Sequence, residues 1–232
     1  MALDRETTSE TLFKRWCCQW PVRVQRIEAP DNAKHKRPDY RVYFETQACV
    51  VEVTEMAPNT EDLRQQKELD SQNSVLWSAK PGHRLRKQID HARGKFGRWA
   101  RSGVPTLLVV HDTTSASPPR NIDPYDAKVA MYGLDAVVFS VPLEPSTEPR
   151  VRFRKSGAKA KLTDKHHTSI SAVGNLFETQ SGVELVVYHN VFARIPFDPA
   201  CVRKLTRYQY RYVNEQGEFG AWIHAVTGER LT

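Results

Sequence analysis

The chain has 232 residues, 40% of them hydrophobic, which is enough to bury the core of one domain. No apolar run approaches the ~20 residues that a membrane-spanning helix needs, and the polar start MALDRETTSE is neither a signal nor a transit peptide, so we expect a cytoplasmic protein with no membrane partner. The net charge of +7 suits a polyanionic partner, and the four cysteines, without a CxxC pair, predict neither a zinc site nor a disulfide framework.

The N-terminal segment predicts a helix followed by a strand. Thr7 and Glu10 fit a capping box, apolar residues then recur at helical spacing, and Pro21 ends the pattern. Alternation between residues 22 and 28 is typical of a first strand.

The segment RPDYRVYFETQACVVEVTE, residues 37 to 55, predicts a hairpin that turns around Glu45 and Thr46. Pairing outward from this turn sets Asp39 opposite Glu52, with their Cβ atoms roughly 5 Å apart. Two carboxylates held this close can share a divalent cation, and Mg²⁺ (or Mn²⁺) prefers such oxygen ligands.

A second interpretation of the same pair stays open, because the two carboxylates could be solvated or paired with Arg37 or Arg41. The valines around Glu52 favour the metal site, since they predict a strand buried on both faces, where a carboxylate is costly unless it is paired or metal-bound. The basic surroundings suit an anionic substrate.

The remaining pattern predicts an α/β fold with a mixed central sheet flanked by helices. Residues 56 to 82 are polar and aperiodic, which is typical of a long functional or disordered loop. An amphipathic helix from Leu85 to Trp99 faces the core with one apolar stripe and carries basic residues opposite. Further elements are expected at residues 105–112 (buried strand), 125–132 (helix), 135–141 and 151–153 (strands), and 170–177 with 183–189 (hairpin). We assign residues 1–195 to the core and residues 196–232 to a β-hairpin extension of the same domain.

Most of the net charge lies between Arg150 and His167, where seven Lys/Arg face one acid. This segment is either a DNA-contacting arm or a solvated loop, and because Ser156 and Gly157 would break a strand, we expect a mobile arm that orders on DNA. The candidate nucleic-acid contacts are Lys36, Arg37, Arg84, Lys155, Lys159 and Lys161.

The order of these elements, with Pro38-Asp39 and then Glu52-x-Thr54, resembles the PD-(D/E)xK superfamily, whose members have the restriction-endonuclease-like fold. The resemblance covers roughly residues 7 to 195, and it is nearest to uncharacterised bacterial members with a VEVKE-like third strand. Further matching positions are Glu10, the helix from Arg84 to Phe96, Gly103-Val104-Pro105, Ala130-Met131-Tyr132-Gly133 and Tyr188-His189-Asn190.

The resemblance implies that Asp39 and Glu52 hold the metal and that the backbone carbonyl of Val53 completes the coordination. Glu10 is either a third carboxylate or only the capping-box residue. One departure is serious, because Thr54 stands where the family has its lysine and a neutral hydroxyl cannot supply a cation.

We take Lys87 as the candidate for a lysine that has moved to the helix, although a solvated position on the helix face is the more common place for such a lysine. Together these features predict a magnesium-dependent endonuclease that cleaves DNA phosphodiester bonds, with Asp39, Glu52, Thr54 and Lys87 as catalytic residues. The alternative is a catalytically lapsed nuclease-fold protein that binds nucleic acid or assembles into a complex. A homodimer and a subunit of a defence, repair or mobile-element complex are both open.

Overall fold

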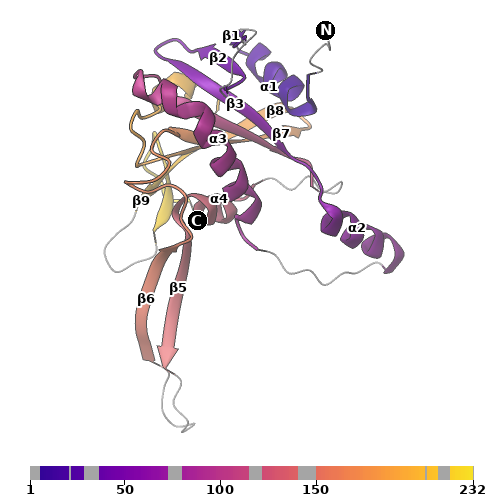
Figure 1. The fold of residues 1–232 in the computed structure, drawn as a ribbon, viewed down its shortest axis with the longest axis vertical. Coiled ribbons are helices and arrows are strands. Elements are labelled where there is room, and N and C mark those ends of the chain that lie inside the picture. Colours follow the sequence, from indigo (N-terminus) through magenta and orange to yellow (C-terminus); the bar gives the residue numbers. More distant parts are fainter. Residues whose placement is uncertain are drawn as a thin grey trace.

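The fold is α/β, with a large mixed sheet flanked by helices, as the sequence predicts (Figure 1). A computed structural model describes residues 6–20, 22–28, 37–72, 80–114, 122–140, 150–206, 208–213 and 220–231. None of the helices described there is long and apolar enough to cross a membrane.

Eight strands form the main sheet in the order β1-β2-β3-β4-β7-β8-β9-β10. The central neighbours β3–β4 and β4–β7 are parallel, as is β8–β9, and the other pairs are antiparallel. The C-terminal hairpin β9–β10 therefore extends the same sheet as the core. The strands are β1 (Arg23–Arg26), β2 (Tyr40–Tyr43), β3 (Ala48–Met56), β4 (Thr106–Asp112), β7 (Ala172–Thr179), β8 (Gly182–His189), β9 (Gln209–Val213) and β10 (Ala221–His224).

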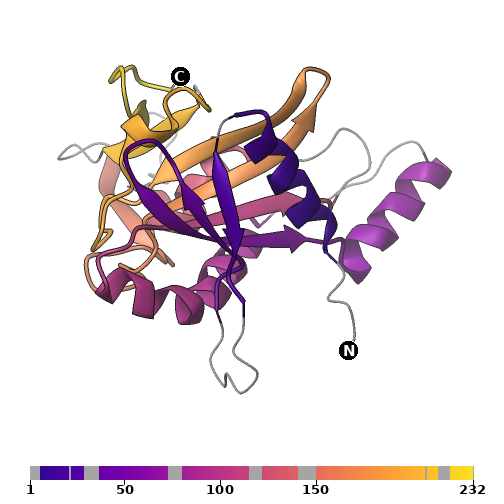
Figure 2. The same cartoon turned by 90° about the horizontal axis from the view of Figure 1, so that it is seen from above.

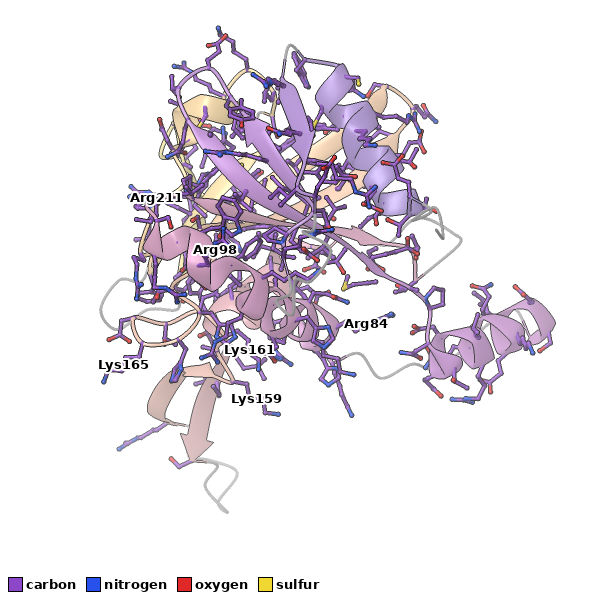
Figure 3. All side chains as sticks on the ribbon, turned by 45° about the horizontal axis from the view of Figure 1, so that its top comes forward. Arg84, Arg98, Lys159, Lys161, Lys165 and Arg211 are labelled. Carbon is purple, nitrogen blue, oxygen red and sulfur yellow. The ribbon has the colours of Figure 1, made fainter. Side chains whose placement is uncertain are left out.

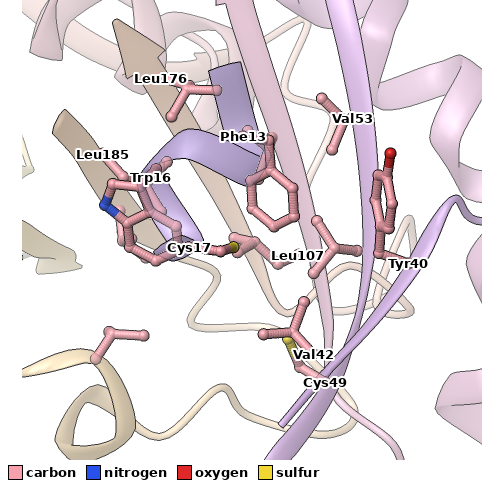
Figure 4. Packing of buried hydrophobic residues seen from close by; sticks show 14 of the residues in the cluster. Phe13, Trp16, Cys17, Tyr40, Val42, Cys49, Val53, Leu107, Leu176 and Leu185 are labelled. Carbon is pink, nitrogen blue, oxygen red and sulfur yellow. The ribbon is translucent and has the colours of Figure 1, made fainter. Parts of the chain in front are cut away.

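Helix α1 (Thr8–Cys18) covers one face of the sheet, and its predicted capping box between Thr7 and Glu10 is present. Phe13 and Trp16 pack from this helix onto the inner side chains of the central strands, among them Val53 and Leu107 (Figure 4). Burying large aromatic side chains of this kind is the main driving force for placing the helix there.

Helices α3 (His83–Arg101) and α4 (Pro124–Tyr132) cover the opposite face, as the view from above shows (Figure 2). The predicted apolar stripe of α3 is buried, with Ile89 and Phe96 fully inaccessible beside Leu108 and Val110 of β4. Strand β4 is thus covered on both faces, which explains its uninterrupted apolar sequence.

The expectation of an aperiodic connection between residues 56 and 82 is wrong in part, because residues Thr60–Gln72 form helix α2. This helix has no apolar stripe to reveal it. Asn59 accepts from the N–H groups of Glu61 and Asp62 as a cap, and Arg64 pairs with Glu61 along the surface. The apolar residues 75–77 lie outside the described part of the chain.

The expectation of a mobile basic arm is also wrong, because β6 (Arg150–Ala158) pairs with β5 (Leu134–Ser140) in a separate two-stranded ribbon. Ser156 and Gly157 lie within β6, at a register shift opposite Leu134 to Ala136. Gly157 adopts φ 83°, a conformation that glycine reaches at little cost, so the irregularity is absorbed as a bulge and the strand continues.

Candidate metal centre

The two predicted carboxylates lie at the end of β2 and in the middle of β3. Tyr40 pairs with Val51, so the next position along the ladder sets Asp39 opposite Glu52, as the sequence predicts. The Asp39 N–H donates to the Val51 carbonyl (3.1 Å), and Oδ2 of Asp39 accepts from the Val53 N–H (2.8 Å). The backbone of β3 therefore fixes the position of the Asp39 carboxylate.

Glu52 lies on the α3 face of β3, between Val50 and Thr54, and only 5% of its surface is exposed. Its Oε1 forms an ion pair with the ammonium group of Lys95, which α3 brings across the strand. No N–H group and no hydroxyl of the described residues donates to its buried Oε2, and a hydrogen bond between Glu52 and Asp39 needs a proton on one of the two carboxyl groups. A buried carboxylate oxygen without a donor is costly, and a cation would relieve that cost.

Both carboxyl groups of the pair, Asp39 and Glu52, have raised pKa values, which a nearby positive charge would lower. Burial, and then the neighbouring Asp39, raise the pKa of Glu52 to about 8, although Lys95 acts in the opposite direction. Burial also raises the pKa of Asp39, opposed by the Val53 N–H and by Lys95. Two adjacent buried carboxyl groups hold their protons more tightly than usual because neither ionises easily beside the other.

The lysine at this site is Lys95, which corrects the sequence-based choice of Lys87. Lys87 is exposed on α3, eight residues before Lys95. Thr54, two residues after Glu52, donates from Oγ1 to Oε1 of Gln88 (3.1 Å).

The sequence contained a signal for Lys95 that the simple division into apolar and polar faces missed. Gln88 and Lys95 are seven residues apart, two helical turns, so both lie on the flank of α3 that faces β3. A long side chain on such a flank can cover apolar surface with its stem and reach inward with its charge.

Glu10 forms the predicted capping box, and its charge also acts on the carboxylate pair, because it helps to raise the pKa of Asp39. Its Oε2 accepts from the Thr7 N–H (2.9 Å), while Oε1 accepts from the Tyr40 hydroxyl (3.1 Å) and lies 3.5 Å from Arg26 Nη2. Burial alone would raise the pKa of Glu10, but the bonds from Thr7 and Tyr40 and the charge of Arg26 lower it overall. Within the described ranges, no three His, Cys, Asp or Glu side chains gather as a metal site.

The donors present fit a hard divalent cation held by two carboxylates and one carbonyl. In an extended strand the N–H and C=O of one residue point to the same side, as the exchange of bonds in antiparallel pairs requires. The Val53 N–H points to Asp39, beyond the end of β2, so the Val53 carbonyl leaves β3 on that side as well. Together with the orphan Oε2 of Glu52, this gives an all-oxygen donor set of the kind that Mg²⁺ and Mn²⁺ accept.

The predicted nucleic-acid contacts fall into separate regions. Arg37 is partly buried next to the site, and Arg84, at the start of α3, pairs with Asp62. Lys159 is exposed, and Lys161 binds Asp90. Lys36 lies outside the described residues, and so does the side chain of Lys155, whose backbone belongs to β6.

No family model matches the chain, and no curated protein and no solved structure matches it significantly. The chemistry of the site therefore has to follow from its own geometry.

Proposed function

We propose that the chain is a metal-dependent endonuclease with a restriction-endonuclease-like core, which hydrolyses DNA phosphodiester bonds at a PD-(D/E)xK-like site. The observation that supports this most is the meeting of three groups: Asp39 and Glu52 on neighbouring strands, and the Lys95 ammonium at Glu52. The family pattern places its lysine two residues after the second acid, whereas here the cation reaches the same carboxylate from α3.

In this proposal Asp39, Glu52 and the Val53 carbonyl hold Mg²⁺ or Mn²⁺. The bound ion would supply a Lewis acid that lowers the pKa of water and neutralises charge on a phosphate. The protein's own contribution is the rigidity of the donors, because β3 is buried on both faces and the backbone of Val53 fixes Asp39. Preorganised ligands of this kind need little rearrangement during the reaction.

Lys95 takes the role that Thr54 cannot fill. Its ammonium group lies beside the carboxylate that would carry the metal, so it is placed to orient an attacking water and to stabilise negative charge on the phosphate. Thr54 instead holds Gln88 on the same flank of α3 and thereby helps to position the helix against β3.

Nicking of supercoiled plasmid with Mg²⁺ or Mn²⁺ tests this function. We expect Asp39→Asn to abolish nicking, because it removes one of two metal carboxylates. We expect Lys95→Ala to lower the rate at saturating DNA by about 10²- to 10³-fold, the usual loss for one charge-stabilising donor. Lys87→Ala removes the same charge from the same helix and should lose far less.

If Lys87→Ala lowers the nicking rate more than Lys95→Ala does, the catalytic lysine has been assigned wrongly. If the wild-type protein and Asp39→Asn are equally inert with both ions, the chain is not a nuclease.

A second function is favoured by the same ion pair. Since the Lys95 ammonium group already lies beside Glu52, it can take the place of the metal in a nuclease-fold protein that only binds nucleic acid or assembles into a complex. Calorimetry with Mn²⁺ separates the two functions. An isotherm that is lost in Glu52→Ala supports the enzyme, whereas DNA binding without any Mn²⁺ isotherm supports the lapsed nuclease.

A further inference from the structure

Helix α3 separates the carboxylate site from a strongly basic surface. The helix contains seven Lys/Arg and a single acid, Asp90. Its β3 flank carries Gln88 and Lys95, its apolar stripe faces the sheet, and the remaining side faces outward with His91 and Arg98 exposed. Positive charge is therefore presented on the side of the helix that lies away from the core.

The one acid of α3 is covered by bases from another segment. Asp90 binds Lys161 Nζ (2.5 Å) and His167 Nε2 (3.1 Å), both from the loop of residues 159–167 that follows β6. This contact joins the loop to the helix and offsets the charge of Asp90, while the loop keeps one acid of its own, the exposed Asp164. We call the joined surface the basic face and define it by its described members Arg84, His91, Arg98, Lys159, Lys161 and Lys165. Figure 3 labels all of these residues except His91.

The loop of the basic face is preformed. Leu162 is buried with 1% exposure, and the N–H groups of Lys161 and Leu162 both donate to the Met131 carbonyl (3.1 and 2.8 Å). The hydroxyl of Thr163 accepts from the Lys165 N–H (3.2 Å). Charges on such a loop are already placed, so a partner that binds them pays little for ordering the chain.

The environment of His83, at the start of α3, reports the local concentration of cations. Burial lowers the pKa of His83, and so do four neighbouring cations: Lys87, Arg86, Lys80 and Lys159. The last of these comes from the loop, so cations of the loop and of the helix both act on His83. Such a concentration of cations attracts and holds polyanions.

The β5–β6 ribbon projects from the body of the molecule and leads directly into the loop (Figure 1). The sequence of β6 adds Arg150, Arg152, Arg154 and Lys155 to the same region of the chain. A two-stranded ribbon has a width that the major groove of a DNA duplex accommodates.

The chemistry of the basic face favours a duplex over a single strand. Proteins that hold single strands stack bases on exposed aromatic side chains. Among the described residues, the exposed aromatics are Tyr125 and Phe192, and neither belongs to α3 or to the 159–167 loop. Rigid cations without a stacking platform match the regular phosphate backbone of a double helix.

We propose that the basic face and the adjoining β5–β6 ribbon bind double-stranded DNA across α3, which brings one phosphate backbone to the Asp39–Glu52 pair. The choice of DNA rests on the proposed nuclease function. The surface itself rests on the contacts of Asp90 and on the fixed loop.

Fluorescence anisotropy with a labelled 20-base-pair duplex in EDTA tests this surface without any metal. The variant Arg98→Ala/Lys159→Ala/Lys165→Ala removes three exposed charges from the basic face. Its matched control, Arg15→Ala/Arg203→Ala/Lys204→Ala, removes three exposed charges beside α1 and the β7–β8 turn, away from the basic face.

We expect the basic-face variant to bind at least about tenfold more weakly near physiological salt. The slope of log affinity against log salt should flatten by up to about three, near 0.9 for each lost phosphate contact. The control should bind like the wild-type protein. A single-stranded 20-mer should bind more weakly than the duplex, and thermal melts of both variants should match the wild-type melt.

Equal losses in the two variants would overturn the proposal, since net charge alone would then account for binding. So would wild-type affinity in the basic-face variant, a lack of duplex binding by the wild-type protein, or a single strand that binds as tightly as the duplex. Plasmid nicking and the Mn²⁺ isotherm test the nuclease function separately from the DNA-binding surface. If those fail while the duplex results hold, the nuclease function is wrong and the surface stands; if nicking persists while the duplex results fail, the surface alone is wrong.

Discussion

At the scale of single residues, the candidate site consists of Asp39 and Glu52 on neighbouring strands and of Lys95, whose ammonium group reaches Glu52 from α3. The period of two along a strand, together with the turn near Glu45, fixes which side chains oppose each other, so Asp39 and Glu52 could be paired from sequence. Lys95 belongs to the boundary between the buried and exposed sides of α3, where helical periodicity does not say which way a long side chain turns.

The raised pKa of Glu52 predicts a stability that falls with pH when no metal is present. The folded protein keeps a proton on Glu52 up to about pH 8, whereas the unfolded chain releases it near the ordinary value of 4.5. Between these values the folded state binds more protons, so the free energy of unfolding decreases as pH rises through this window. Glu52→Gln removes this linkage and should flatten the pH dependence, so that the variant avoids a loss on the order of a few kcal/mol that the wild-type protein shows between pH 5 and pH 8.

Urea denaturation in EDTA at pH 5 and pH 8 measures this effect. Glu45→Gln, at an exposed glutamate, serves as the control and should follow the wild-type protein. Parallel pH dependence of Glu52→Gln and the wild-type protein would mean that Glu52 titrates normally and is not the strained group that a cation would relieve.

At the scale of elements, sequence patterns worked where an element packs against the core and failed where it does not. The apolar stripe of α3 and the unbroken apolar run of β4 report burial directly. Helix α2 exposes Leu63 and Leu69 and is stabilised by a cap and surface ion pairs, which leave no stripe. Only residues 151–153 of β6 were expected as a strand, because glycine normally interrupts strands, whereas here Gly157 forms a bulge and the strand continues to Ala158.

The base of the β5–β6 ribbon depends on a close approach between two glycines. Gly133 has φ 88°, and a Cβ placed there would lie 2.4 Å from the carbonyl carbon of Gly157. Gly133→Ala should therefore destabilise the protein by about 2 kcal/mol or more, because backbone must move and the conformation is strained. Gly94→Ala, in α3, is the matched control, because a Cβ at Gly94 would meet no atom within 4 Å. This substitution should stabilise the helix by up to about 1 kcal/mol.

Thermal melts measure the stability of both glycine variants. In a chain of this size, each kcal/mol of unfolding free energy shifts the melting temperature by roughly 2–4 °C. A Gly133→Ala protein that melts like the wild-type protein would show that the ribbon does not need this contact.

At the scale of the whole molecule, the fold class could be predicted but the sheet order could not. Alternating strands and helices predict a mixed sheet, since each element must bury one side. The parallel pairing of β8 with β9 depends on a connection through a short 3-10 helix at Pro199–Val202 and on packing between distant residues. The distribution of charge likewise emerges only in three dimensions, because Asp90 lies seventy residues or more from the bases that cover it.

Anomalous diffraction from a crystal grown with Mn²⁺ tests the central claim most directly. We predict a peak bounded by Asp39, Glu52 and the Val53 carbonyl, with the Lys95 ammonium displaced from Glu52 Oε1 yet still beside the ion. Such an ion would contact Oε2 of Glu52, which no N–H group or hydroxyl of the described residues reaches, and would lower the pKa that burial and Asp39 raise. A fully ordered site with no peak, in which Lys95 stays paired with Glu52, would contradict the metal centre and leave the ion pair as a purely structural contact.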